Sequence, residues 1–393
     1  MSADAGEIPA VYMRGGTSKG VFFHAHDLPA SRRERDALLL RIIGSPDPYG
    51  RHSDGMGGAT SSTSKVVIVS PSTREGCDVD YLFGAVSIDQ PLIDWSGNCG
   101  NLAAAVGPFA IGEGVMDIAA IAVDDPAARL SNGYSRVRIW QQNLGRRIDA
   151  WVPMRDGLVI EEGNYAEDGV AFAGAEIRLE YLNPADRPLP TGAVRDVLQL
   201  ADGTSVEATL IDAGNPTVFI PARAVGLTAR ETPEQVDRKP QLLQRLEEIR
   251  ALAAVRMNLA ASVEEASARR PATPKVAWVA PPVASVSSSG KAVAADAIDV
   301  LARILSMGKL HHAFTGTGSI ALAVAAAIPG TVVSEAARTL PGVPTRIGHL
   351  SGTMAVGAEV AFRNNQWRAE KCMMSRSARR LMRGVVYVAG RHV

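Results

Sequence analysis

Cys99 stands between two asparagines and two glycines in the segment Ser96–Asn101, directly before the small apolar run Leu102–Val106. This pattern predicts a tight turn that opens a buried helix, because glycine lets the backbone approach a ligand closely. The first turn of such a helix presents unpaired N–H groups and a positive dipole end, which stabilise a thiolate. A lone cysteine after a turn is usually structural, but Asn98 and Asn101 add polar contacts that a packed core does not need. We therefore predict an anion site in which Cys99 acts as an acid or a base.

Lys65 is a second candidate, because it stands where a polar loop meets a buried strand. Residues 54–64 are mainly glycine and hydroxyl residues, whereas Val66–Val69 is a run of β-branched residues typical of a buried strand. A lysine at the mouth of a strand is predicted to transfer a proton or to clamp a carboxylate. The alternative is a serine-rich linker, which the strands predicted closely on both sides disfavour.

The segment Arg14–Gly20 is a third candidate, placed between the predicted strand Ile8–Met13 and its continuation Val21–Phe23. Its glycines, its hydroxyls and Lys19 suit a carboxylate or a phosphate. It does not match a Walker loop. Taken alone, it is equally well a turn between two strands with an exposed lysine.

The second half of the chain repeats this scheme loosely. A predicted strand Val206–Asp212 runs into the turn Ala213–Pro216, and the glycine turn Thr315–Ser319 leads into the small-residue helix Ile320–Ile328. The two glycine turns with their helices favour two pseudo-equivalent halves. The later turn also matches the loose dinucleotide pattern GxGxxA, but no buried strand precedes it, so we reject a dinucleotide site. The adjacent pair His311–His312 is interpreted as a satisfied or solvent-facing pair.

Composition sets wider limits. At 393 residues the chain exceeds the size of one core, and Lys plus Arg equals Asp plus Glu at 41 each, so no global field recruits nucleic acid or a membrane. Three cysteines without metal-binding spacing fit a reduced cytoplasm, and we predict no metal. The first residues contain no apolar signal region, and the longest apolar run, 320–328, is too short to span a bilayer.

The positioning elements are expected to form a sheet wrapped around a central helix, because helices do not alternate with strands as a doubly wound fold requires. The arginine-rich stretch 346–393 is either a solvated helix face or a source of arginines for an acidic substrate, and without interleaved aromatic residues it is no nucleic-acid surface. The other expectations are helices over 27–43 and 239–269, strands over 118–123 and 295–300, and a stiff proline-rich linker over 183–190.

Five segments together resemble the PrpF-type 2-methylaconitate cis-trans isomerases, and the resemblance covers almost the whole chain. They are Met13–Gly20, Gly57–Lys65, Trp95–Asn101, Gly214–Pro216 and Met374–Arg379.

The resemblance implies an α+β, diaminopimelate epimerase-like fold of two similar domains, each a central helix wrapped by a mainly antiparallel sheet, with the active site in the cleft between them. The domains are expected over 1–185 and 191–393, with about the last 15 residues packing against the first. A cofactor-free reaction on a small unsaturated tricarboxylate is implied, with Lys65 and Cys99 as the proton carriers. We expect a cytoplasmic protein and leave the quaternary state open, a homodimer included.

The same reading assigns substrate contacts to both halves of the chain. Cys99 and the turn Thr317–Ser319 are predicted to face each other across the cleft, because two helix N-termini suit one anion. The predicted substrate-binding residues are Gly16, Thr17, Ser18, Lys19, Ser64, Asn98, Gly100, Asn101, Asn215, Thr317, Gly318 and Ser319.

The chain departs from racemases of this fold, which place a second cysteine in the glycine turn of the second domain. The turn Thr315–Ser319 holds none, so racemisation by two thiols is disfavoured. One thiol with a lysine suits proton transfer at a carbon allylic to a carboxylate. Two alternatives stay open: a 4-oxalomesaconate tautomerase or related methylene-shifting isomerase, and a non-catalytic accessory protein of an aconitase-type dehydratase.

Overall fold

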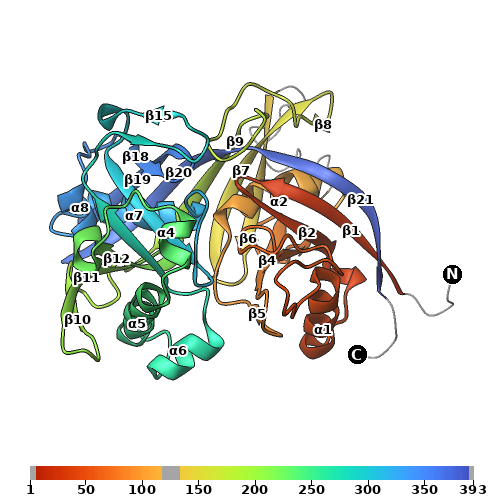
Figure 1. The fold of residues 1–393 in the computed structure, drawn as a ribbon. Coiled ribbons are helices and arrows are strands. Elements are labelled where there is room, and N and C mark those ends of the chain that lie inside the picture. Colours follow the sequence, from red (N-terminus) through yellow and green to blue (C-terminus); the bar gives the residue numbers. More distant parts are fainter. Residues whose placement is uncertain (1–5, 117–132, 389–393) are drawn as a thin grey trace. The chain divides into compact units, whose positions relative to one another are not determined.

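The computed structural model describes residues 6–116 and 133–388 (Figure 1). The strand predicted over 118–123 lies outside the described residues. The chain forms two compact units: the first comprises Met1–Ala166, Phe172–Leu179 and Arg376–Val393, and the second Glu167–Ala171 and Glu180–Ser375. The domain limits at 185 and 191 stay a prediction. The chain last leaves the first unit after Leu179 and returns to it at Arg376.

The first unit is a curved, mixed sheet with two main helices. Its strands follow the order β21-β1-β2-β3-β4-β6-β7, in which the pairs β2–β3 and β4–β6 are parallel and the rest antiparallel. The helices are α1 (Arg32–Ile43) and α2 (Gly100–Gly112). The strands are β1 (Gly6–Gly15), β2 (Ser18–His24), β3 (Lys65–Pro71), β4 (Val79–Val86), β5 (Ile93–Asp94), β6 (Gly133–Gln141), β7 (Arg146–Arg155), β8 (Leu158–Val159), the start of β9 (Ile177–Ala185) and β21 (Ala378–Val388).

Helix α2 lies at the centre of this unit, and all its residues from Gly100 to Ala110 are buried. Successive side chains of a strand point to opposite faces of the sheet. Phe22 of β2 therefore contacts Phe109 of α2, with ring centroids 5.5 Å apart, while its neighbours Val21 and Phe23 pack in the cluster that includes Leu39 of α1. The predicted central helix wrapped by a sheet is confirmed.

The second unit is built in the same way around helix α7 (Gly316–Ala327), which is buried from Gly316 to Ala326. Its other helices are α4 (Pro233–Asp237), α5 (Pro240–Arg256), α6 (Val263–Arg269) and α8 (Val332–Ala336). Its strands are β10 (Asp196–Gln199), β11 (Ser205–Ala213), β12 (Asn215–Pro221), β13 (Lys275–Ala280), β14 (Ser285–Val286), β15 (Ala292–Val293), β16 (Val300–Ser306), β17 (Lys309–Leu310), β18 (Thr345–His349), β19 (Gly352–Arg363) and β20 (Gln366–Arg376).

The predicted repeat is confirmed by the strand pairings of the two units. The succession β1-β2-β3-β4-β6-β7 alternates antiparallel and parallel pairings, and β11-β12-β13-β16-β18-β19 alternates them identically. In each series a long connection that contains helices separates the second strand from the third: α1 in the first unit, and α4, α5 and α6 in the second. The central helix of each unit precedes its last two strands.

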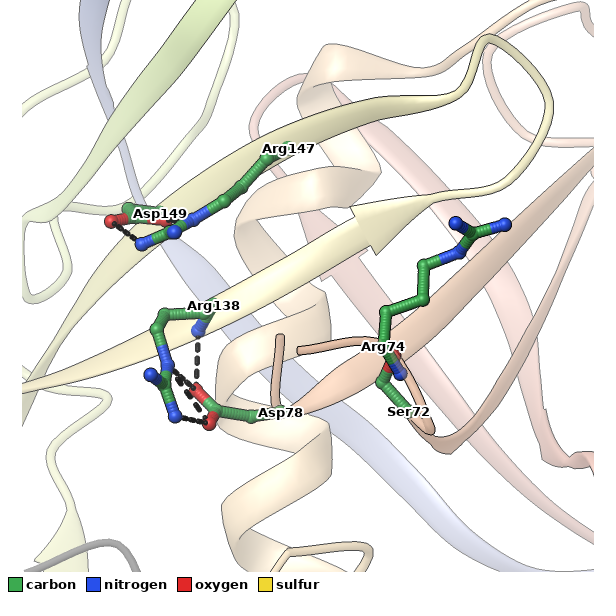
Figure 2. Close-up of polar contacts among 6 residues, drawn as sticks. All are labelled: Ser72, Arg74, Asp78, Arg138, Arg147 and Asp149. Carbon is green, nitrogen blue, oxygen red and sulfur yellow. Dashed lines mark hydrogen bonds and ion pairs between the residues drawn. The ribbon is translucent and has the colours of Figure 1, made fainter. Parts of the chain in front are cut away.

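One ion pair recurs at the same place in both repeats. Asp78 precedes β4 and accepts hydrogen bonds from the backbone and guanidinium of Arg138 on β6, at 2.6 Å to the backbone N–H (Figure 2). Asp299 precedes β16 and accepts the same bonds from Arg346 on β18, at 2.7 Å to the N–H. Bidentate pairs of this kind fix orientation as well as charge, so each one ties a parallel strand to its neighbour.

The helix predicted over 27–43 starts later than expected. Residues Ala25–Asp27 form one turn of 3₁₀ helix, and α1 begins only at Arg32. Pro29 explains the difference, because the residue before a proline is driven into extended backbone and Leu28 has ψ 153°. The predicted end is confirmed, since Gly44 caps the helix in the left-handed conformation with φ 85°.

Other expectations are wrong. The helix predicted over 239–269 is two helices, α5 and α6, separated where Asn258 adopts a positive φ of 57°. The segment Ala295–Ala297 is a 3₁₀ turn, and the strand begins only at Val300. The linker predicted over 183–190 is partly strand, because β9 continues to Ala185. Of the two interpretations of the arginine-rich stretch 346–393, the helix face is wrong, because the described part is mainly strand, β18 to β21.

Glu231 and Trp278 form a buried polar contact in the second unit, with Trp278 Nε1 donating to Glu231 at 2.9 Å. Burial raises the pKa of Glu231, but hydrogen bonds from Thr228 and Trp278 lower it more, so it lies below 4.5. A carboxyl with a depressed folded pKa stabilises above its unfolded pKa and loses that effect as the pH falls through the folded value. We expect Glu231→Gln to lower the free energy of unfolding by about 1–3 kcal/mol at neutral pH.

The measurement is urea unfolding, followed by tryptophan fluorescence for both proteins at several pH values. The difference in the free energy of unfolding should shrink steadily once the pH falls below 4.5. An equal difference at neutral and acidic pH would show that the ionised carboxylate of Glu231 contributes nothing.

Candidate functional site

Cys99 is the N-cap residue of α2, as predicted. Its Sγ accepts a hydrogen bond from the N–H of Leu102 at 3.5 Å and lies 4.0 Å from Ser18 Oγ. Tyr81 holds the backbone from the sheet side, since its hydroxyl donates to the carbonyl of Cys99 at 3.2 Å. The side chain thus stands within the first turn of a buried helix, where the helix dipole favours an anion.

The two other cysteines lie elsewhere. Burial raises the pKa of the Cys77 thiol, and burial raises that of Cys372 much further. Neither stands at a helix N-terminus. Cys99 is therefore the thiol with a setting suited to chemistry.

The glycine segment 14–20 is a tight hairpin, so most of it belongs to strands β1 and β2 instead of a loop. Gly15 pairs with Ser18, and Gly16 has a φ of 50° at the turn. A side chain on Gly16 would come within 2.8 Å of Asn101 Oδ1, and one on Gly15 within 2.5 Å of the Asn101 carbonyl. Glycine is required here because the hairpin lies directly against the first turn of α2.

Asn101 joins the hairpin to α2 through its side chain. Its Nδ2 donates to Thr17 Oγ1 at 3.0 Å and to Ser18 Oγ at 3.4 Å. Its Oδ1 accepts from Nε of Arg376 at 3.1 Å. Gly16, Thr17, Ser18, Cys99, Gly100 and Asn101 of the predicted site thus lie together.

Lys65 is the first residue of β3, as predicted, and only 7% of it is exposed. Since Val66 packs in the α1 cluster, Lys65 points to the opposite, α2-facing side of the sheet. Gly20 lies between the lysine and α2, because a side chain there would meet both Lys65 Cβ at 3.2 Å and Leu102 Cδ1 at 3.1 Å. The ammonium lies 4.9 Å from the ring centre of Phe83.

The remaining predicted residues of the first unit lie in the β1–β2 hairpin, in the loop before β3 and directly before α2. Lys19 donates its backbone N–H to the carbonyl of Ser62, and its ammonium lies 5.3 Å from the Tyr12 ring centre. Ser64 lies 3.2 Å from Nδ1 of the buried His52. Asn98 is buried beside Cys99. Lys19 is half-buried, whereas Lys65 is buried.

The second unit places a threonine where the first has its thiol. Thr315 is the N-cap of α7, and its Oγ1 accepts from the N–H of Gly318 at 3.2 Å. Ser319 donates to the carbonyl of Gly316, while Thr317 and Asn215 are buried.

The repeat also places a lysine, Lys275, at the start of β13, where the first unit has Lys65 at the start of β3. Its ammonium donates to the carbonyl of Ala272 at 3.3 Å. Sequence reasoning missed Lys275, because the equivalence appears only in the strand pairings. The predicted approach of Cys99 to Thr317–Ser319 joins the two units, each of which is described by itself, and stays a prediction.

Arg376 was missed as a site residue, although the motif Met374–Arg379 contains it. It is the last residue of β20, is 2% exposed and contacts Asn101. The backbone carbonyl of the next residue, Ser377, accepts hydrogen bonds from the Gly16 N–H at 2.8 Å and from Arg14 at 2.9 Å. The arginine-rich stretch therefore supplies one arginine to the site, which a solvated helix face would not.

Within residues 6–116 and 133–388, no group of three or more His, Cys, Asp or Glu side chains could hold a metal ion. Among the helices of the same residues, none is long and apolar enough to cross a membrane.

The model of the PrpF protein family matches residues 6–389. The chain belongs to the PrpF family. A 2-methyl-aconitate isomerase of Shewanella oneidensis is 51% identical over 97% of each chain, and one of Cupriavidus necator is 50% identical over 98% of each. The solved structure of a methylitaconate-delta-isomerase covers 98% of this PrpF chain and 96% of its own, with 38% identity and a TM-score of 0.74.

The epimerase-like fold extends beyond the PrpF family. A hydroxyproline epimerase from Agrobacterium vitis covers 98% of this chain and 94% of its own, with 11% identity and a TM-score of 0.54. That likeness shows the fold alone. Together with the repeat, it confirms the predicted α+β architecture of two similar halves.

Proposed function

We propose that this PrpF-family isomerase interconverts the cis and trans forms of 2-methylaconitate by allylic proton transfer. The observation that carries the proposal is the pairing, in one unit, of a thiol at the start of α2 with a buried lysine at the start of β3. Two relatives of about 50% identity named 2-methyl-aconitate isomerase support the substrate.

The reaction needs a base that removes a proton from the carbon allylic to a carboxylate. The electron pair then forms a double bond between that carbon and its neighbour, and the electrons of the former double bond move into the carboxylate conjugated with it. The former double bond becomes a single bond that can rotate. Return of a proton to the same carbon gives the other geometric isomer, so no atom is gained or lost. Cys99 and Lys65 are the proposed carriers, and either can serve as base or acid.

The charge that develops on the carboxylate has to be stabilised by donors already in place. In the first unit these are the N–H groups at the start of α2, the hydroxyls of Thr17 and Ser18, and the ammonium of Lys19. None of these groups must be brought in from solvent at the moment of reaction. The proposed substrate is the tricarboxylate, and the proposed reaction uses no cofactor.

The test compares turnover of 2-methyl-trans-aconitate, trans-aconitate and 4-oxalomesaconate in deuterated buffer without added metal. We expect the first to react fastest and to gain deuterium at its allylic position. Fastest turnover of 4-oxalomesaconate would assign the protein to the tautomerases instead. No turnover of any of the three would favour the non-catalytic accessory role.

Chelation is expected to leave activity unchanged, because the mechanism uses only side chains and backbone N–H groups. The measurement is kcat before and after dialysis against EDTA. Loss of turnover that a divalent metal restores would overturn the cofactor-free mechanism.

A further inference from the structure

Arg376, Asn101, Thr17 and Ser18 form a connected chain of side chains within the first unit. Arg376 Nε donates to Asn101 Oδ1 at 3.1 Å, and Asn101 Nδ2 donates to Thr17 Oγ1 at 3.0 Å and to Ser18 Oγ at 3.4 Å. Arg376, Asn101 and Ser18 are each 2% exposed. A buried contact of this kind is strengthened by the low local dielectric and is costly to break.

The direction of these hydrogen bonds is fixed by the arginine. A guanidinium carries only donors and stays protonated at any ordinary pH. The oxygen of Asn101 must therefore face Arg376, which turns the two amide N–H groups toward Thr17 and Ser18. Because the hydroxyl oxygens of Thr17 and Ser18 then act as acceptors, their own protons are left to donate elsewhere.

We propose that Arg376 is a positioning residue that, through Asn101, aims the hydroxyl protons of Thr17 and Ser18 at a substrate carboxylate. The inference rests on the proposed function for the identity of the anion, but the chain of contacts is independent of it. Ser18 Oγ lies 4.0 Å from Cys99 Sγ, so the hydroxyl of Ser18 stands next to the proposed proton carrier.

The hairpin geometry supports the same assignment. Gly16 has a φ of 50°, and a side chain there would come within 3.0 Å of Arg376 Cδ. The carbonyl of Ser377 also accepts from the Gly16 N–H at 2.8 Å, so the arginine and the hairpin are locked together. Arg376, which stands 275 residues after Asn101 in the sequence, is thus held in one geometry.

The experiment measures KM and kcat for 2-methyl-trans-aconitate, and the affinity for tricarballylate, a saturated and unreactive tricarboxylate, by calorimetry. We expect Arg376→Gln to raise KM and weaken tricarballylate binding roughly 10- to 100-fold, with a smaller change in kcat. Arg376→Lys keeps a permanent donor and should restore part of the loss. The exposed Arg379 of β21 provides the matched control, and Arg379→Gln should behave as the wild type.

Asn101→Asp separates the effect of hydrogen-bond direction from the effect of side-chain packing. The carboxylate keeps the shape and pairs with Arg376, but it can only accept, so Thr17 and Ser18 would turn their protons toward it. We expect a loss of tricarballylate affinity at least as large as that of Arg376→Gln, in a protein whose circular dichroism and Tm are those of the wild type. Arg376→Gln added to Asn101→Ala should cost nothing more than Asn101→Ala alone.

The ratio of tricarballylate affinities of the wild type and Arg376→Gln should also be the same at pH 6 and pH 9, because amide and hydroxyl side chains do not ionise in that range and a guanidinium offers only donors. Wild-type KM and tricarballylate affinity in Arg376→Gln, or full additivity with Asn101→Ala, would overturn the proposal. Loss of tricarballylate binding in the variants of a protein that turns over none of the tested substrates would leave this inference standing and remove the proposed substrate.

Discussion

Lys65→Ala is expected to lose roughly 10²-fold or more in kcat, the usual scale of lost acid–base catalysis. The lysine is buried at the first residue of β3, on the face that looks toward α2, and the strand fixes its position. A group that acts in the transition state lowers kcat when it is removed, whereas a group that only binds raises KM. We expect Lys65 to matter more than any other lysine of the chain.

Lys19→Ala is the matched comparison, because Lys19 is half-buried in the hairpin and better placed to bind a carboxylate than to move a proton. Its KM should rise while kcat changes little. Matching circular dichroism spectra come first, since both variants must be folded. A near-normal kcat in Lys65→Ala would remove that lysine from the mechanism and leave Cys99 as the one assigned proton carrier.

Cys99→Ser is expected to lower kcat by roughly 10²- to 10⁴-fold, because a hydroxyl is a far weaker acid than a thiol. The variant keeps an acceptor for the N–H of Leu102, which now bonds to Cys99 Sγ, so α2 retains its cap. Cys99→Ala removes that cap as well. It should lose activity to the same degree and also about 0.5–2 kcal/mol of stability.

The measurement pairs steady-state kinetics with thermal unfolding of both variants. Cys372→Ser is unsuitable as a control because that side chain is fully buried, whereas the half-buried Cys77 offers one: Cys77→Ser should keep its kcat. Retention of more than about a tenth of kcat in Cys99→Ser would show that the thiol carries no proton in the slow step.

Local features of the site could be predicted from the sequence. Cys99 and Lys65 lie where the pattern places them, because glycine turns, small-residue helices and β-branched strands are each encoded within a few neighbouring residues. The sheet wrapped around a central helix could be predicted because many short strands surround one buried helix in the sequence. The start of α1 differs from the predicted one because Pro29 drives Leu28 into extended backbone.

What could not be predicted depends on contacts between distant parts of the chain. Nothing near Arg376 indicates that it meets Asn101, since the contact exists only after β20 and the β1–β2 hairpin are in place. The matching pairs Asp78–Arg138 and Asp299–Arg346 are likewise not evident in the sequence, because the partners stand 60 and 47 residues apart. The equivalence of Lys65 and Lys275 becomes evident only from strand register.

Strand β21 has a consequence for the order in which the chain acquires its structure during synthesis. β1 pairs with β21 from Gly6 to Gly15, and Figure 1 shows the blue strand lying along the red one. A ribosome releases residues 6–116 long before residues 378–388, so the unit that holds Lys65 and Cys99 leaves the exit tunnel with one long strand edge unpaired. Proteins whose domains are continuous can complete the first domain while the rest is being made. Here the second unit can be finished first, and the unit that holds the proposed proton carriers is completed only after β21 has emerged.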